Sequence, residues 1–247
     1  MAIPAPPWQR QPKARPVRQP LSQELIVDAA LGVLQREGLD AVTMRRVAQA
    51  LDTGAASLYA HVANKDELHK LLYDAVVGLI PTPAPEAGAW QEQMKQFIRD
   101  AVLVMRRYPG IGRLGMANIP TGPNALRQAE TWLAVLRGGG LADQVAAYAC
   151  DLIGLFISAT AFEEALYLEM GKSQEDLQTY FQQLHGYFKS LPADQFPNMV
   201  ALVDAMFAWD PDHDDRFEFQ LDVLVQGLAH TSWNRKPAGA PHFLKNP

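Results

Sequence analysis

The sequence predicts an all-α protein that consists of a small and a larger helical unit. Apolar residues recur at intervals of three and four along every long segment, and no segment shows the alternation typical of a strand. Prolines and glycines fall between these periodic segments. A chain of 247 residues with 48% hydrophobic composition can bury one sizeable core and a small satellite domain. The expected parts are an arm (1–20), a small unit (21–80), a larger unit (81–235) and a tail (236–247).

Residues 43–65 are predicted to form two short helices joined by a three-residue turn. Apolar residues at helical spacing would bury one face of each helix. The turn begins at Asp52, a residue type that tolerates the left-handed conformation better than most. This arrangement is typical of a helix-turn-helix, whose second helix enters a DNA major groove. The apolar residues concerned are Val47, Ala48, Leu51, Leu58 and Val62.

The exposed face predicted for the second helix is small and almost uncharged. At 100° per residue, Ala56 and Ala60 lie opposite the apolar face, and Ser57 and Tyr59 flank them. Small side chains let a helix backbone approach base edges, but they read few hydrogen-bonding groups. Arg45, near the start of the first helix, is therefore the better candidate for direct base readout.

The same segment resembles the DNA-binding domain of the TetR family of one-component repressors. Leu-Tyr-Ala-His at 58–61, followed by Lys65, matches that family's L-Y-x-H-x-x-x-K signature, and the match runs without gaps over 42–65. The family usually places Gly in the turn, where this chain has Asp52. The resemblance implies that the Tyr, His and Lys positions touch phosphates, with hydroxyls at the groove edge. The expected DNA-contacting residues are Thr43, Arg45, Ala55, Ala56, Ser57, Tyr59, His61 and Lys65.

The first twenty residues contain six prolines and four basic residues but no acidic residue. Proline at this density prevents a helix and favours an extended, disordered arm. Two interpretations are equally open: the arm binds the minor groove beside the helix-turn-helix, or it has no role. Residues 1–70 carry nine Lys or Arg against seven Asp or Glu, whereas 71–247 carry thirteen against twenty. The DNA-facing end is thus the basic one.

Helical periods continue along the rest of the chain. A helix bounded by Ser22 and Gly38 would support the DNA-binding unit, and a capping box of Asn64 and Glu67 would open a connecting helix that ends near Ile80. Further helices are expected over 90–108, 123–137, 141–170, 173–191, 196–209 and 216–232.

The helix at 141–170 is apolar nearly all round, which indicates burial on more than one side. Its small residues would form a groove for close helix approach, and the last helix offers a leucine-rich face. We expect these faces to build an intersubunit four-helix bundle in a homodimer that reads a palindromic operator. The alternative is that both helices simply fill the monomer core. The residues concerned are Gly154, Ser158, Ala161, Ala165, Phe217, Leu221, Leu224 and Leu228.

The C-terminal two-thirds resembles the tetracycline repressor branch of the family, through Trp-Gln at 90–91, a Tyr-Pro-Gly corner at 108–110 and Phe-Glu-Phe-Gln-Leu at 217–221. The resemblance implies an internal small-molecule pocket whose occupation releases DNA. For any one candidate the alternative is ordinary core packing. The apolar candidates are Phe97, Val104, Met105, Met116, Trp132, Phe156 and Phe162, and Glu163 or Glu164 could meet a cationic group.

Neither a metal nor a cofactor is expected, because the six histidines show no metal-ligand spacing. Tetracycline is not the expected ligand, since the family's two metal–drug histidine positions align with Pro81 and the His-free stretch 113–115. The glycines at 110–115, with Glu130, satisfy a dinucleotide-binding pattern formally. That pattern requires a preceding strand, and a helical segment stands there instead. We interpret it as a chance match.

Cys150 is the single cysteine, so no intramolecular disulfide forms, and we expect an inert thiol in a reducing compartment. The longest near-apolar stretch, 152–162, falls short of the roughly 18 to 20 residues that span a bilayer. No export signal is recognised, which predicts a cytoplasmic protein.

Together these patterns predict a non-enzymatic, ligand-responsive transcriptional regulator, a repressor that a small-molecule effector releases from double-stranded DNA. Two alternatives belong to other classes. A helix-turn-helix that binds a protein partner would show no steep salt dependence with DNA. A small all-α enzyme would need a nucleophile–base pair or a metal site, neither of which the sequence offers.

Overall fold

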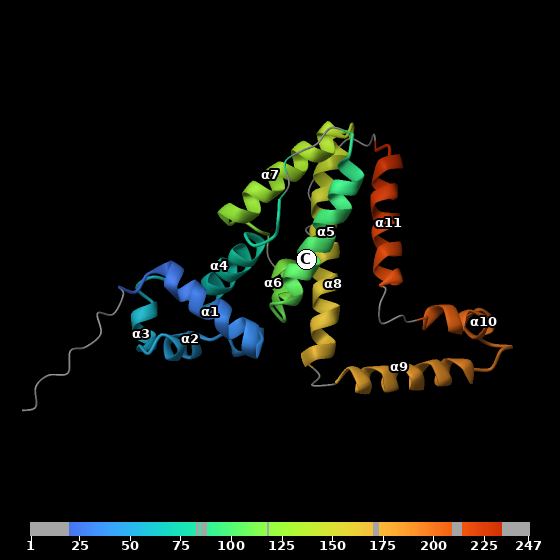
Figure 1. The fold of residues 1–247 in the computed structure, drawn as a ribbon, viewed down its shortest axis with the longest axis horizontal. Coiled ribbons are helices and arrows are strands. Elements are labelled where there is room, and N and C mark those ends of the chain that lie inside the picture. Colours follow the sequence, from blue (N-terminus) through green and yellow to red (C-terminus); the bar gives the residue numbers. More distant parts are fainter. Residues whose placement is uncertain are drawn as a thin grey trace, which may run out of the picture.

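The computed structural model describes residues 20–82, 84, 88–117, 119–169, 173–208 and 214–233. These residues form helices and connecting turns without any strand, which confirms the all-α prediction (Figure 1). The predicted arm, apart from Pro20, and the predicted tail lie outside this description.

A reading head (residues 22–64) forms the small amino-terminal unit. Ser22 begins it as the N-cap of α1, where its hydroxyl accepts a hydrogen bond from the backbone N–H of Leu25 (3.2 Å). Ile26, Val33 and Leu58 are fully buried among its helices, so the predicted apolar faces do form its core. Its elements are α1 (Gln23–Glu37), the short 3-10 helix η1 (Leu39–Ala41), α2 (Met44–Ala50) and α3 (Ala55–Leu58).

Helix α4 (Lys65–Val77) connects the reading head to a larger cavity domain (residues 88–233). Within the cavity domain α5, α6 and α7 pack against the long helix α8, and α11 packs against α5 (Figure 1). The pair α9 and α10 extends away from this body. The bounds are α5 (Trp90–Arg106), α6 (Ile111–Ala117), α7 (Pro123–Gly138), α8 (Asp143–Glu169), α9 (Gln174–Lys189), α10 (Pro197–Met206) and α11 (Asp215–His230).

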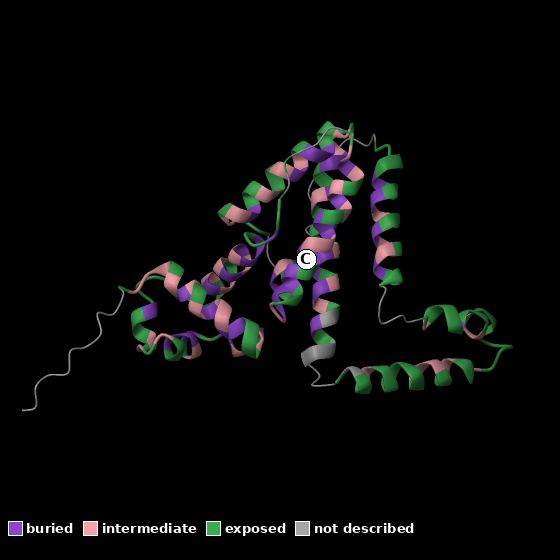
Figure 2. Cartoon of the chain, in the orientation of Figure 1, coloured by how far each residue is buried: buried purple, intermediate pink, exposed green. Residues whose placement is uncertain are grey.

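One continuous hydrophobic core runs through both units, and α4 contributes to each side of it. Leu68 and Leu72 are fully buried, and α4 contacts α1 of the reading head as well as α5, α6 and α7. Figure 2 shows buried residues continuing from α4 into α5, α6 and α8, whereas α9 and α10 are largely exposed. The connecting helix is therefore packed on both units and cannot move without disturbing one of them.

Helix α6 was not predicted, because its glycine-rich sequence has poor intrinsic helix propensity. The tertiary structure explains it: a Cβ on Gly112 would lie 2.3 Å from the backbone oxygen of Ser158, so glycine permits α6 to lie directly on α8. The element before α6 is the helix α5, which agrees with rejecting the dinucleotide-binding interpretation.

The faces predicted to pair two subunits are buried within one chain, which corrects the residue assignment for the dimer. Ser158, Ala161 and Ala165 are buried, and the close approach made at Ser158 is to α6 of the same chain. On α11, Phe217 stacks on Phe156 with ring centroids 6.0 Å apart. Leu221 and Leu228 are buried, Leu224 is half-buried and Gly154 lies exposed. Helical spacing identifies an apolar face but does not say which helix will cover it.

Helix α8 also corrects the expectation about membrane spanning. Over Asp143–Glu163 it is long and apolar enough, by length and composition alone, to cross a bilayer. Its contacts with α5, α6 and α7 offer a second explanation, because a helix that is central to a packed domain is apolar on several sides.

Candidate DNA interface and ligand cavity

The turn of the helix-turn-helix is built around Asp52, whose φ of 50° is left-handed as predicted. The backbone N–H of Thr53 donates to the carbonyl of Ala48 (2.9 Å), and that of Asp52 donates to the carbonyl of Gln49 (3.1 Å). These two bonds form the Schellman arrangement that ends a helix and satisfies its last carbonyls. The angle between α2 and α3 is thereby fixed by backbone hydrogen bonds.

Helix α3 is shorter than predicted, since it ends at Leu58 and the chain continues as turns to His61. Val62 is nevertheless fully buried. Its N–H donates to the carbonyl of Leu58 (2.9 Å), so the helical hydrogen-bond pattern continues beyond the end of α3. Ala55 is half-buried. The other expected DNA-contacting side chains are all exposed, namely Thr43, Arg45, Ala56, Ser57, Tyr59, His61 and Lys65.

The two arginines at the start of α2 have different surroundings. Arg46 is held by two hydrogen bonds to the carboxylate of Glu37 (2.9 and 2.5 Å), and these bonds lower the pKa of Glu37. Arg45 is exposed, and no ion pair to it occurs within the described residues. Thr43 caps the helix by accepting from the N–H of Arg46 (3.1 Å). Arg45 is thus the arginine whose guanidinium remains available to a ligand.

Hydrogen bonds fix the segment that carries the histidine and the lysine. The side-chain amide of Gln23 donates to the carbonyl of His61 (3.2 Å), and the side chain of Asn64 caps α4 by accepting from the N–H of Glu67 (2.8 Å). The carboxylate of Glu67 accepts from the N–H of Ala63 (2.5 Å) instead of from that of the cap residue, so only half of the predicted capping box forms.

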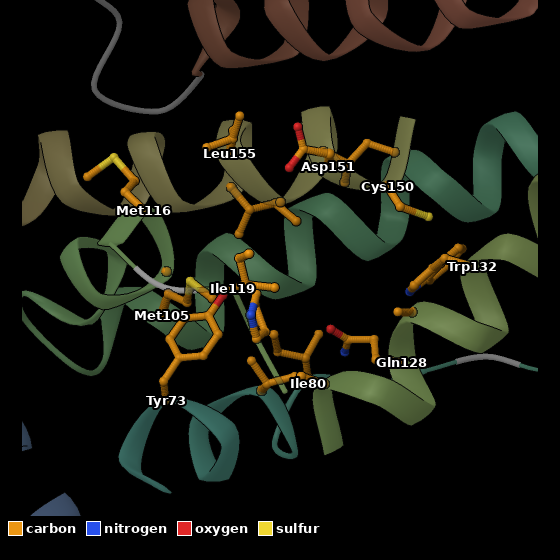
Figure 3. A pocket seen from close by; sticks show the side chains of 18 of the residues that line it. Tyr73, Ile80, Met105, Met116, Ile119, Gln128, Trp132, Cys150, Asp151 and Leu155 are labelled. Atoms are coloured by element: carbon orange, nitrogen blue, oxygen red, sulfur yellow. The ribbon is translucent and has the colours of Figure 1, made fainter. Parts of the chain in front are cut away.

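A cavity of about 410 Å³ lies between α4, α5, α6, α7 and α8 (Figure 3). Its size is that of a small-molecule site. Four of the predicted pocket residues line it: Phe97, Met105, Met116 and Trp132. The rings of Phe97 and Trp132 form one wall, with their centroids 4.3 Å apart.

The other four predicted pocket residues do not line this cavity. Val104 is buried in the core, Phe156 stacks on Phe217, and Phe162 is half-buried elsewhere on α8. Glu163 is exposed, with a carboxylate oxygen 3.5 Å from the guanidinium of Arg216 on α11. All four lie on helices that also contribute lining residues, but one to several positions away, which rotates them to another face.

Polar lining groups were missed by the sequence interpretation. Gln128 on α7 and Trp132, four residues later, each carry a buried N–H without a hydrogen-bond partner in the structure. Burial raises the pKa of Tyr73, and a hydrogen bond with Ser158 opposes that effect. Burial also raises the pKa of Cys150 to about 11, so it is a neutral thiol. The spacing of Gln128 and Trp132 is helical, and this signal could have paired them.

A buried carboxylate joins the connecting helix to α7. Asp74 of α4 is buried, and it accepts from the backbone N–H groups of Asn124 (3.1 Å) and Ala125 (2.9 Å) at the start of α7. It supplies both the hydrogen bonds and the negative charge that a helix N-terminus favours. A Cβ on Gly122 would lie 2.2 Å from Asp74, so glycine is what allows this contact.

An ion pair joins α6 directly to the reading head. The guanidinium of Arg113 donates to the carboxylate of Asp40 in η1 (2.5 Å), and this bond lowers the pKa of Asp40. Two helices that line the cavity are thus linked to other elements by side chains. Arg113 links α6 to η1, and Asp74 links α4 to α7.

These features define a class of protein: a DNA-binding, ligand-responsive regulator with a helix-turn-helix packed on a hollow helical domain. Residues 26–71 match the model for bacterial regulatory proteins of the tetR family, and residues 82–232 match that for the tetracyclin repressor-like C-terminal domain. The second match covers more than half of the chain. The chain belongs to the TetR family of transcriptional regulators.

Individual relatives agree with this assignment. The HTH-type transcriptional repressor DrrR1 of Streptomyces coeruleorubidus is 30% identical over 234 residues, which cover 92% of this chain and 85% of the relative. The tetracycline repressor protein class E of Escherichia coli is 32% identical over 150 residues, covering 58% and 69%. The structure of ActR from Streptomyces coelicolor in complex with actinorhodin has a TM-score of 0.77 and 43% identity, covering 85% of this chain and 95% of that chain.

Proposed function

We propose that the chain acts as a homodimeric repressor in the cytoplasm, released from a palindromic operator when a small molecule occupies the cavity. One observation carries the proposal: an exposed helix-turn-helix surface and an internal cavity share a single core through α4. A relative that is a repressor and a structural neighbour that binds actinorhodin support the two halves of this function.

On DNA, Arg45 would read bases, and Tyr59, His61 and Lys65 would hold phosphates. The exposure of these side chains and the fixed turn at Asp52 support those roles. Ala55 and Ala56 would let the backbone of α3 come close to base edges, with Thr43 and Ser57 at the groove edge. Phosphate contacts set the position on the duplex, and Arg45 supplies most of the sequence choice.

The dimer interface would use the apolar surface that one chain leaves uncovered. Tyr148, Leu152 and Leu155 on α8, with Phe219 and Val223 on α11, are exposed to about half or more of their area. Exposed apolar side chains gathered on neighbouring helices mark an interaction surface. A two-fold partner on this surface would place two reading heads on half-sites about 34 to 36 Å apart.

The ligand signal would travel through the two side-chain links to the reading head. A molecule in the cavity touches α7 and α6 together, since both line it. Movement of α7 would pull Asp74 and therefore α4, and movement of α6 would pull Arg113 away from Asp40. A coupling free energy of about 1 to 3 kcal/mol would account for release.

We propose no enzymatic activity for this chain. In the part of the chain that the structure describes, no group of three or more His, Cys, Asp or Glu could hold a metal ion. Cys150 is the one thiol among the described lining residues of the cavity. Burial keeps it in the neutral form, which is unfavourable for a nucleophile.

The decisive experiment selects binding sites from a random duplex pool with the full chain and then titrates small molecules against the selected duplex. Fluorescence anisotropy should show sequence preference, a steep salt dependence and release by an effector. Binding that ignores both base order and salt would favour a helix-turn-helix that binds a protein partner and would overturn the proposal.

A further inference from the structure

Two of the residues that line the cavity carry a buried N–H donor for which the described structure provides no acceptor. The side-chain amide nitrogen of Gln128 and the indole nitrogen of Trp132 are both buried without a partner. They are four residues apart on α7, so they lie on one face of the helix, and both side chains project into the cavity (Figure 3). A buried donor without an acceptor is costly, so two in one cavity indicate where acceptor atoms of a ligand belong.

The charge of the lining restricts the ligand further. Among the described lining residues there is no Lys, Arg or His, and the one charged side chain is the acidic Asp151 at the exposed side of α8. A ligand carboxylate would leave water without any cation to receive it and would face a like charge. The cavity therefore disfavours anions.

The walls favour a flat aromatic molecule. Phe97 and Trp132 present ring surfaces, and three methionines, Met94, Met105 and Met116, supply polarizable side chains that adapt to a ring. The cavity's volume of about 410 Å³ lies within the range of sites that bind drug-sized molecules. That volume accommodates several fused rings.

We propose that the cavity takes an uncharged, flat aromatic ketone whose two carbonyl oxygens accept hydrogen bonds from Gln128 and Trp132. This inference rests on the proposed function, because it names the chemistry of the effector at the same site. Among the described lining residues, Gln128 and Trp132 carry the buried donors that lack a partner, so these two side chains on α7 orient the ligand.

The test compares three molecules of one shape on the full-length protein without DNA: anthraquinone, anthracene and anthraquinone-2-carboxylate. Binding is measured by quenching of tryptophan fluorescence and by calorimetry. Anthraquinone should bind at least tenfold more tightly than either of the others, because only it is both neutral and able to accept two hydrogen bonds.

Two variants locate the effect. Gln128→Leu replaces the amide with an apolar side chain of similar size, and Trp132→Phe removes the indole N–H but keeps an aromatic ring. Each variant should weaken anthraquinone binding about tenfold and anthracene binding less than twofold. Gln183→Leu on α9, an exposed glutamine away from the cavity, is the matched control and should change neither affinity.

Several results would overturn the inference: equal affinity for anthracene, tighter binding of the carboxylate, variants that affect both ring systems alike, or no binding of anthraquinone up to its solubility limit. Because DNA is absent, these outcomes are separate from the proposed function. If the protein binds anthraquinone but stays bound to operator DNA, the proposed function alone is wrong. If only carboxylated molecules release the protein from operator DNA, this inference alone is wrong.

Discussion

In the reading head, Leu58 and Val62 are buried as their spacing predicts. In the cavity domain, aromatic residues with the same helical spacing occupy different surroundings. Phe97 lines the cavity, but Phe156 on the neighbouring helix α8 stacks on Phe217. The reading head consists of short helices with one apolar face each, so each face has a single place to go. The cavity domain has helices covered on several sides, and a periodic pattern there leaves several arrangements open.

The largest expected effect lies in the core of the reading head. Leu58→Ala removes a fully buried side chain from a small unit and should lower the free energy of unfolding by about 2 to 5 kcal/mol. Operator binding should be lost, because Leu58 holds α3 against the core of the reading head. Denaturant unfolding measures the stability loss. The exposed Leu202→Ala on α10 is the control and should change stability by less than about 0.5 kcal/mol. Similar losses for both would remove the contrast between the regions.

The next largest effect is expected where α4 contacts the start of α7. Asp74→Ala leaves one buried N–H group (Ala125) and one partly buried N–H group (Asn124) of α7 without an acceptor and should cost about 1 to 3 kcal/mol of stability. The ratio of operator affinities without and with effector should also fall towards one, as anisotropy titrations can show. The control is Asp143→Ala, an exposed carboxylate in the first turn of α8. A full response to effector in the Asp74 variant would contradict the route through α7.

The DNA surface should separate sequence choice from affinity. Arg45→Ala should reduce discrimination between operator and random DNA by about 1 to 3 kcal/mol, because a base contact is lost. Lys65→Ala should weaken both complexes evenly. It should also reduce the magnitude of the slope of log affinity against log salt by about 1, because one phosphate contact is lost. Identical losses on both duplexes for the two variants would refute these assignments.

The smallest effect concerns pH at the boundary of the two regions. Burial, with a smaller contribution from Lys65, lowers the pKa of His69 on α4 below its ordinary value of 6.5. The folded state therefore binds fewer protons than the unfolded state, and stability should fall as pH drops through about 6.5. Asp66 opposes this effect, and Arg113 adds to it.

The melting temperature between pH 7.5 and 5.5 should decline less steeply in His69→Gln than in the natural chain. The exposed His230→Gln should keep the natural slope. Identical slopes for all three proteins would show that His69 does not titrate in this range.

The sequence was sufficient for features that depend on neighbours along the chain. Asp52 adopts the left-handed turn because its own backbone preference and the adjacent helix ends allow it. Ser22 and Asn64 cap the helices that follow them, since a cap needs only the next turn of backbone. The exposure of the expected DNA-contacting side chains between Thr43 and Lys65 follows from the same local geometry. The family signature lies within this segment.

Only the tertiary structure decided features that depend on distant partners. Helix α6 forms against its own propensity because Gly112 lets it lie on Ser158 of α8. The unused donors of Gln128 and Trp132 become significant only because five helices leave a space beside them. Local sequence determines backbone turns, caps and apolar faces through short-range sterics and hydrogen bonds. Which faces meet, and where they fail to fill the interior, is set by packing among helices far apart in the chain.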